Sequence, residues 1–150
     1  EIGASFGLVQ INKFKKFNIL RNRNFKLIYD FFKKLGNHFI VPKVKKNVKT
    51  NFLAYPIILK SNQNFSRKEI QIYLEKHKIQ TRPIFTGNTL RHPAFSNLIS
   101  KRNKLNSFKN SDYIMKNGIL IGCHQGLELK NIKYIHKQIN IFLKKHLIKN

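Results

Sequence analysis

The sequence predicts an α/β fold in which a short, mostly antiparallel sheet carries helices on one face and follows a long N-terminal helix. Three observations support this prediction. An amphipathic stripe without proline fills the first 35 residues, three apolar runs bounded by polar segments are typical of strands, and helical patterns separate and follow these runs. With 150 residues and 41% hydrophobic content, the chain is long enough for one domain with a substantial core.

The first helix is predicted to run from about Ser5 to Leu35, and Gly36 ends it as glycines commonly end helices. Apolar side chains recur along it at three-to-five-residue steps, as on one face of an amphipathic helix. They are Phe14, Phe17, Leu20, Phe25, Ile28, Phe31 and Leu35. A helix of about thirty residues is long for a small domain, so we expect residues 1–36 to connect two domains. Some of Phe14, Phe17 and Leu20 should then be exposed in this chain.

Residues 37–150 are predicted to form the domain itself. Its first strand, Asn51 to Leu59, is an apolar run between polar segments. Pro56 lacks an N–H group and cannot donate a hydrogen bond to a neighbouring strand, so we expect this strand at a sheet edge or with a bulge. Two more strands are predicted at Gln80–Phe85 and Gly118–Cys123, with a short helix between them at Asn110–Lys116.

Two further helices have recognisable ends. Ser66 and Glu69 have the spacing of a capping box, which opens a helix that ends near His77. Its inward-facing residues are predicted to be Ile70, Tyr73 and Leu74. The last helix, from about Glu128 to Leu147, begins with an acid and ends with lysines, which complement the helix dipole. It should bury Ile132, Ile135, Ile139, Phe142 and Leu143.

The loop after the second strand carries most of the candidate binding residues. Gly87 and Asn88 are the residue types that best tolerate the backbone of a tight turn. Arg82 and Arg91 present planar forks suited to phosphate or carboxylate, and they repel each other unless an anion lies between them. The pattern therefore indicates an anion-binding loop at a strand end, with a solvated basic turn as the alternative.

Histidines and the cysteine provide the remaining candidates. His92 lies in the same loop and His124 follows an apolar strand, so either is a site residue or a solvent-exposed loop histidine. No pair of histidines has the spacing of a zinc site, which argues against a metal. Cys123 lies in a strand predicted to be buried, so it is interpreted as a small hydrophobic residue. A single cysteine excludes an internal disulfide and suits a reducing cytoplasm.

The net charge of +24 raises the alternative of a stand-alone basic module that binds RNA or another polyanion. Lys outnumbers Arg by 24 to 6, and Lys, Asn, Ile and Phe make up half of the chain. These residues have A/T-rich codons, so genome bias accounts for much of the charge. The lysines are scattered over every predicted helix, without a recognition helix or zinc spacing, which disfavours nucleic acid. No apolar run has the length of a membrane span.

Several motifs occur in a specific order from Glu1 to about Leu143. They are Glu1-Ile2-Gly3-Ala4, Gly7-Leu8-Val9-Gln10, Thr81-Arg82-Pro83, Gly87-Asn88, His92-Pro93, Asp112-Tyr113-Ile114-Met115, Gly118-Ile119-Leu120-Ile121-Gly122-Cys123-His124 and Gly126-Leu127. In this order they resemble the C-terminal part of the DegT/StrS family, pyridoxal-phosphate enzymes with the type I aspartate-aminotransferase fold. The Thr-Arg-Pro and Gly-Asn pieces are most similar to the sugar 3-dehydratase branch. One departure is Glu128, where the family often starts its final helix with Ser or Thr.

The resemblance implies a cofactor, pyridoxal 5'-phosphate, that residues outside this chain bind. In such enzymes a lysine forms the Schiff base and an acid holds the pyridine nitrogen. In the dehydratase branch a histidine replaces that lysine and acts as a base. All of these positions lie upstream of the one that matches Glu1, so the resemblance implies no catalytic residue here and a large cofactor-binding domain upstream. Alone, the chain should be inactive.

The resemblance also implies a substrate, an assembly and a location. It implies a nucleotide sugar, specifically a 4-keto-6-deoxyhexose, in lipopolysaccharide or deoxysugar biosynthesis, and leaves amination and dehydration open. It implies a cytoplasmic homodimer. The expected substrate-binding residues are Arg82, Thr86, Asn88, Arg91, His92 and His124. We expect the arginines and Asn88 to face a cleft between domains, with the two histidines near its rim.

Overall fold

The computed structural model describes residues 1–48, 50–98 and 105–147. In this part of the chain, four strands form one sheet in the order β1-β2-β4-β3, and every neighbouring pair is antiparallel. The strands are β1 (Phe39–Ile40), β2 (Ala54–Leu59), β3 (Thr81–Pro83) and β4 (Gly118–Gly122). The α-helices are α1 (Ile2–Lys34), α2 (Arg67–Lys76), α3 (Lys109–Asn117) and α4 (Leu129–Leu147). The predicted α/β fold with a mostly antiparallel sheet is confirmed.

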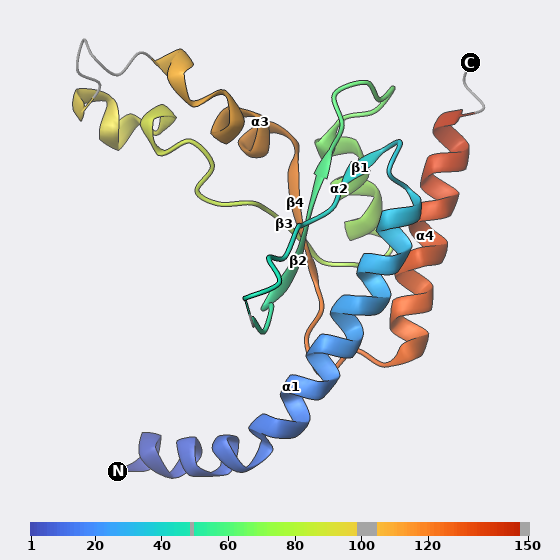
Figure 1. Cartoon of the computed structure of the whole chain (residues 1–150). Coiled ribbons are helices and arrows are strands. Elements are labelled where there is room, and N and C mark those ends of the chain that lie inside the picture. Colours follow the sequence, from blue (N-terminus) through green and yellow to red (C-terminus); the bar gives the residue numbers. More distant parts are fainter. Residues whose placement is uncertain (49, 99–104, 148–150) are drawn as a thin grey trace.

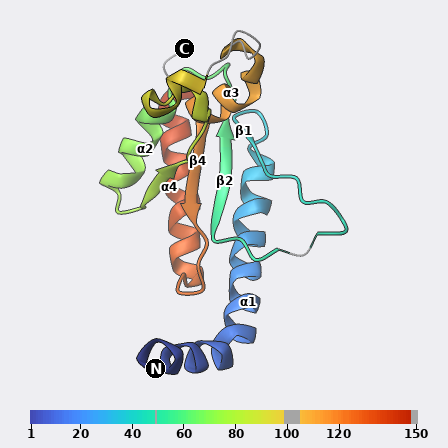
Figure 2. The same cartoon turned by 90° about the vertical axis from the view of Figure 1, so that its left-hand side faces the viewer.

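The sheet is covered by helices on one face only. Figure 1 shows α1, α2 and α4 on one side of the strands, and Figure 2 looks onto the other side, with α4 behind β4. Successive side chains of a strand point to opposite faces. In β2 the buried residues are accordingly Tyr55, Ile57 and Leu59, and their neighbours are half-buried. Burial therefore alternates along the strand because helices cover only one face.

The core lies between the sheet and these three helices. It contains Ile119 and Ile121 from β4, Ile28 and Phe32 from α1, and residues from α2 and α4. All five residues predicted to be buried in the last helix are buried: Ile132, Ile135, Ile139, Phe142 and Leu143. The inward-facing prediction for α2 holds for Ile70 and Leu74, while Tyr73 is half-buried.

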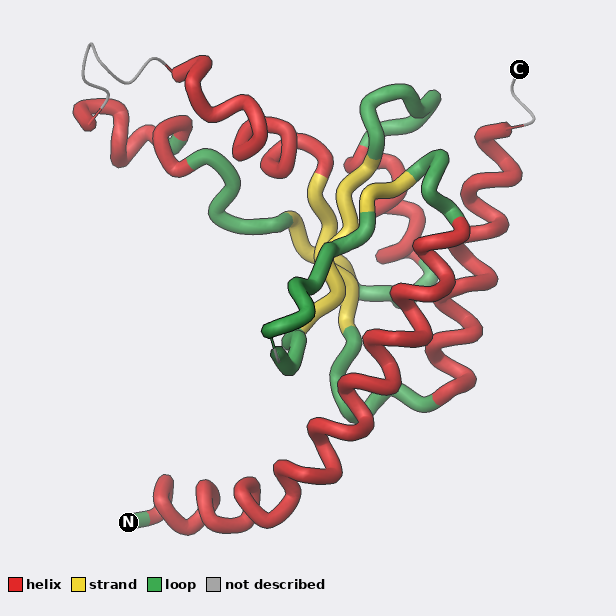
Figure 3. The backbone as a smooth tube through the Cα atoms, viewed as in Figure 1, coloured by secondary structure: helices red, strands yellow, loops and turns green. Residues whose placement is uncertain are grey.

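The long first helix is confirmed, and its N-terminal half extends away from the core. Phe14 is 61% exposed, Phe17 and Leu20 are half-buried, and the buried residues of α1 begin only at Asn24. The expectation that some of Phe14, Phe17 and Leu20 are exposed is therefore confirmed by Phe14. In Figure 3 the first turns of α1 point toward the helix-free side of the sheet. Within the described ranges, no helix is long and apolar enough to cross a membrane.

The prediction for Pro56 is wrong, because β2 is an internal strand without a bulge in its pairing to β4. The register runs one to one from Ala54 opposite Gly122 to Ile58 opposite Gly118. The strand tolerates proline because β1 pairs with β2 only at Ile58 and Leu59. On the side of β1, no residue pairs with Pro56, so no N–H donor is required there.

The strands on either side of the candidate loop are shorter than predicted. The second predicted strand, Gln80–Phe85, is β3 in the structure. It ends at Pro83, two residues before the predicted end, and it starts at Thr81. There the Glu75 carboxylate accepts hydrogen bonds from the Thr81 N–H, at 2.6 Å, and from its hydroxyl, at 3.0 Å. This carboxylate anchors the start of β3 to the end of α2. The next strand, β4, ends at Gly122 instead of Cys123.

Both predicted helix starts are capped by side chains. The Glu69 N–H donates to Ser66 Oγ at 3.3 Å, and the Ser66 N–H donates to Glu69 Oε2 at 2.7 Å, which confirms the capping box. At the start of α4, the Glu128 N–H donates to Asn131 Oδ1 at 2.9 Å. Position 128 is Glu instead of Ser or Thr, but the start of α4 still has a side-chain acceptor, which Asn131 provides.

A half-buried histidine joins α1 to α4. The His136 ring stacks on Phe31, with ring centroids 4.0 Å apart and planes inclined by 8°. His136 Nε2 is buried and has no hydrogen-bond partner among the described residues. Burial therefore lowers the pKa of His136 below its usual value, because the charged form cannot be hydrated there.

The environment of His136 predicts that the free energy of unfolding depends on pH. A histidine whose pKa is lowered by folding stabilises the fold fully above about pH 6.5, and that contribution is lost as the pH falls toward the folded-state pKa. In the variant His136→Phe the ring stacking is kept and the titration is removed. The free energy of unfolding of the wild type should fall relative to this variant between about pH 7.5 and about pH 5.5. A difference that stays constant over this range, measured by urea denaturation, would contradict the prediction.

Candidate functional site

The predicted Gly-Asn turn is present and is packed against α3. Gly87 has φ +71°, a backbone conformation that side chains rarely adopt. A Cβ atom at this position would lie 2.5 Å from Met115 Cγ. Both the backbone conformation and the close approach of α3 therefore require glycine.

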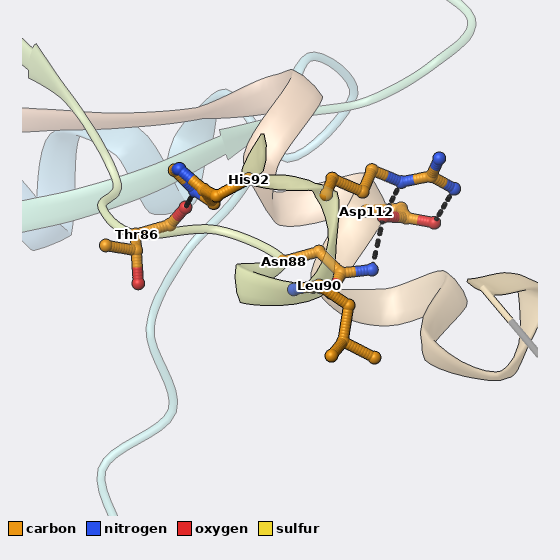
Figure 4. Close-up of polar contacts among 6 residues, drawn as sticks. Thr86, Asn88, Leu90, His92 and Asp112 are labelled. Carbon is orange, nitrogen blue, oxygen red and sulfur yellow. Dashed lines mark hydrogen bonds and ion pairs between the residues drawn. The ribbon is translucent and has the colours of Figure 1, made fainter. Parts of the chain in front are cut away.

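Asp112 of α3 binds two of the predicted site residues. Asn88 Nδ2 donates to Asp112 Oδ1 at 2.7 Å, and Arg91 donates from Nε and Nη2 to the two carboxylate oxygens (Figure 4). Asn88 also accepts from the Leu90 N–H at 3.2 Å. Hydrogen bonds from Arg91 and then from Asn88 lower the pKa of Asp112 to about 2.

The anion that we expected beside Arg91 is therefore supplied by the chain itself. One edge of the Arg91 fork is occupied by Asp112, and the amide of Asn88 is committed to the same carboxylate. These contacts fix the loop on α3. The sequence patterns did not reveal this role of Asp112. The available signal was the scarcity of acids, because with only six acidic residues in the chain each acid is a strong pairing candidate for an arginine.

Thr86 and His92 close the same loop. His92 Nε2 lies 2.9 Å from the Thr86 carbonyl oxygen, and because a carbonyl only accepts, Nε2 carries the proton (Figure 4). His92 Nδ1 is then left as an acceptor. The Thr86 hydroxyl lies 3.5 Å from that of Thr89. The bond between His92 and Thr86 and the bonds to Asp112 together fix the conformation of residues 86–92 through side-chain contacts.

Arg82 lies apart from this loop, on the helix-free face of the sheet. Its neighbour Thr81 is buried and Arg82 is exposed, as alternation along β3 requires. The residue opposite it in β4 is Leu120. Arg82 lines an open cavity of about 690 Å³ together with Leu120, Leu53 and Phe85, of which the last two are 78% and 76% exposed. The lining of this cavity thus combines one cation with apolar and uncharged polar side chains.

His124 does not join the other candidates, because it lies at the opposite end of the sheet. Pro83 pairs with Ile119 and Thr81 with Ile121, so the loop after β3 lies near the start of β4, and His124 follows its end. The six predicted site residues therefore do not form one cluster. The His124 carbonyl accepts from Asn24 Nδ2 at 2.8 Å, a buried contact from α1 that sequence patterns did not reveal.

The described residues offer no cluster of metal ligands, and most of the acids are engaged in contacts within the chain. No group of three or more His, Cys, Asp or Glu side chains that can hold a metal is present among them. Four of the six acids are bound to Ser66, Thr81, Arg91 and Lys130. The other two acids, Glu1 and Asp30, are exposed at the start and on the surface of α1. Burial raises the pKa of Cys123 to about 11, which fits a structural thiol.

The chain is similar to a lipopolysaccharide biosynthesis protein and to sugar 3-dehydratases. The lipopolysaccharide biosynthesis protein RfbH of Salmonella typhimurium is 27% identical over 142 residues, which cover 95% of this chain and 32% of the relative. The structure of Escherichia coli GDP-4-keto-6-deoxy-D-mannose-3-dehydratase with bound hydrated PLP superposes with a TM-score of 0.73 at 25% identity. That match covers 88% of this chain and 33% of the dehydratase chain.

The fold is shared more widely. An aminotransferase from Psychrobacter cryohalolentis superposes with a TM-score of 0.82 at 16% identity, covering 95% of this chain and 38% of that one, which is a likeness of fold alone. The chain thus spans about a third of the length of its relatives. Residues 1–140 match the model of the DegT/DnrJ/EryC1/StrS aminotransferase family. The chain belongs to this family.

Proposed function

We propose that this chain is the C-terminal part of a pyridoxal-phosphate-dependent enzyme that acts on a nucleotide sugar, as a 4-keto-6-deoxyhexose 3-dehydratase or an aminotransferase. The family match over residues 1–140 supports the class of enzyme. The names of the relatives support a role in lipopolysaccharide or deoxysugar biosynthesis. The cofactor is then held by residues outside this chain, which agrees with the engagement of the carboxylates in structural contacts.

The helix-free face of the sheet is the observation that carries the proposal for this domain. Arg82 lies there among exposed apolar side chains, and the fixed loop 86–92 follows at the end of the same strand. A guanidinium on a strand has a defined position and can form two parallel hydrogen bonds to an anionic group. We therefore assign Arg82 to an anionic group of the substrate, and the loop to the boundary of the cleft.

The other loop residues have narrower roles in this proposal. Asn88 and Arg91 hold the loop through Asp112 and can reach the substrate only with their remaining donors. The Thr86 hydroxyl and His92 Nδ1 remain available to hydroxyl groups of a sugar. His124, at the other end of the sheet, is assigned to the rim.

The exposed N-terminal half of α1 supports a larger assembly. Its apolar residues Ile2, Phe6, Leu8, Val9, Ile11, Phe14 and Ile19 are all exposed. A patch of this kind ordinarily packs against another domain or subunit. We propose that residues 1–36 connect this domain to a large cofactor-binding domain, within a cytoplasmic homodimer.

The substrate assignment predicts the effect of one conservative change. The variant Arg82→Lys keeps the charge and loses the fork, so kcat/KM of the whole enzyme should fall by roughly 1–3 kcal/mol, about 5- to 150-fold. Lys26→Arg, an equally charge-conserving exchange at an exposed position of α1 outside the cavity, is the control and should leave kcat/KM unchanged. The assignment is wrong if Arg82→Lys also leaves kcat/KM unchanged.

The loop clamp predicts a change in local dynamics. In the variant Asp112→Ala, the amides of Leu90, Arg91 and His92 should exchange with deuterium faster, because their hydrogen-bond network loses its anchor. Glu128→Ala, which breaks the ion pair with Lys130, is the control and should leave these amides unchanged. Equal exchange in Asp112→Ala and the wild type would rule out the clamp.

The proposed position of the cofactor predicts a labelling result. Pyridoxal 5'-phosphate and borohydride should give no stoichiometric adduct at a unique lysine of this chain, because the proposal places the Schiff-base position upstream of Glu1. Peptide mass mapping distinguishes scattered, substoichiometric labelling of surface lysines from one fully labelled site. A single fully labelled lysine within residues 1–150 would place the cofactor site in this chain and contradict the proposal.

A further inference from the structure

A second cavity, unrelated in its lining to the Arg82 cavity or to loop 86–92, lies where β2 ends and α2 begins. It has a volume of about 630 Å³ and is walled by the segment after β2, the first turn of α2 and the C-terminal half of α3. The Tyr113 hydroxyl donates to the Leu59 carbonyl oxygen at 3.1 Å and so ties α3 to the end of β2. The capping box of Ser66 and Glu69 fixes the start of α2. The walls are therefore held by specific contacts.

The lining of this cavity is strongly positive. Four cationic side chains from the three segments line it: Lys60, Arg67, Lys68 and Lys116. The one acid in the lining is Glu69, and its Oε2 accepts hydrogen bonds from the N–H and the hydroxyl of Ser66, each at 2.7 Å. The carboxylate is thus engaged in the helix cap, and four positive charges face one negative charge.

Arg67 distinguishes this cavity from the general basicity of the chain. It is half-buried, its Nη1 is shielded from solvent, and that nitrogen has no hydrogen-bond partner among the described residues. An unpaired polar atom away from water is costly, and a guanidinium raises that cost. The lysine excess of the composition accounts for exposed lysines on helix surfaces, but it does not account for a half-buried arginine that has no ion pair within the described residues.

We propose that this cavity binds a phosphate-bearing anion that carries two or more negative charges. The planar guanidinium fork matches the oxygens of a phosphate, and the lysines add point charges from three directions. The volume lies in the range of small-molecule sites, about 300–1,000 Å³. The bound anion would supply the counter-charge that the described residues do not give to Arg67.

Binding of inorganic pyrophosphate to the whole protein tests this proposal. Calorimetry at about 0.15 M salt, where diffuse surface attraction is screened, should show one saturable site, with weaker binding of inorganic phosphate. Arg67→Gln should weaken pyrophosphate binding by about tenfold or more, and Arg67→Lys by less, because it keeps the charge without the fork. Lys133→Gln, which removes the same charge from an exposed position of α4 outside the cavity, should leave binding unchanged.

Two results would overturn the proposal. It fails if no saturable binding occurs, or if Arg67→Gln and Lys133→Gln weaken binding equally, since the net charge of the chain would then be responsible. Thermal unfolding of each variant checks its fold. If Arg67→Gln does not fold, the double variant Lys60→Gln with Lys116→Gln replaces it, and binding by this variant as tight as in the wild type overturns the proposal.

Discussion

In the two central strands, Tyr55, Ile57, Ile119 and Ile121 point to the same face of the sheet, where α1, α2 and α4 cover them. Because side chains alternate along a strand, this burial sends the intervening residues to the opposite face. That face receives no helix from the described part of the chain, and it holds Arg82 and Leu120. The position of the candidate site is therefore a consequence of how the core is packed.

A shortage of acids shapes the rest of the molecule. With six acidic and thirty basic side chains, each carboxylate has several possible cations, and the structure uses three carboxylates at structural junctions. Glu69 caps α2, Glu75 anchors β3 and Asp112 fixes the loop to α3. Within the described residues only Arg91 among the arginines has an ion pair, and of the others Arg82 and Arg67 line cavities. These two are the positions where we propose an external anion.

The helices could be predicted from the sequence because their signals are local. The spacing of Ser66 and Glu69 and the apolar period of residues 132–143 each depend on neighbours within one or two turns. Pro56 was placed wrongly because tolerance of proline in β2 depends on the short reach of β1, which no local pattern reports. The separation of His124 from His92 follows from the antiparallel pairing of β3 with β4. The bonds to Asp112 depend in the same way on contacts between distant segments. The substrate role of Arg82 stays a prediction.

The central claim is that this domain works as the C-terminal part of a pyridoxal-phosphate enzyme, with its helix-free face toward a cofactor-binding domain. The most direct measurement is the sequence of the gene upstream of the codon for Glu1. We expect a continuous reading frame that encodes the remainder of a relative's length, with a lysine or histidine at the Schiff-base position. A stop codon directly upstream, or an unrelated domain in that frame, would contradict it.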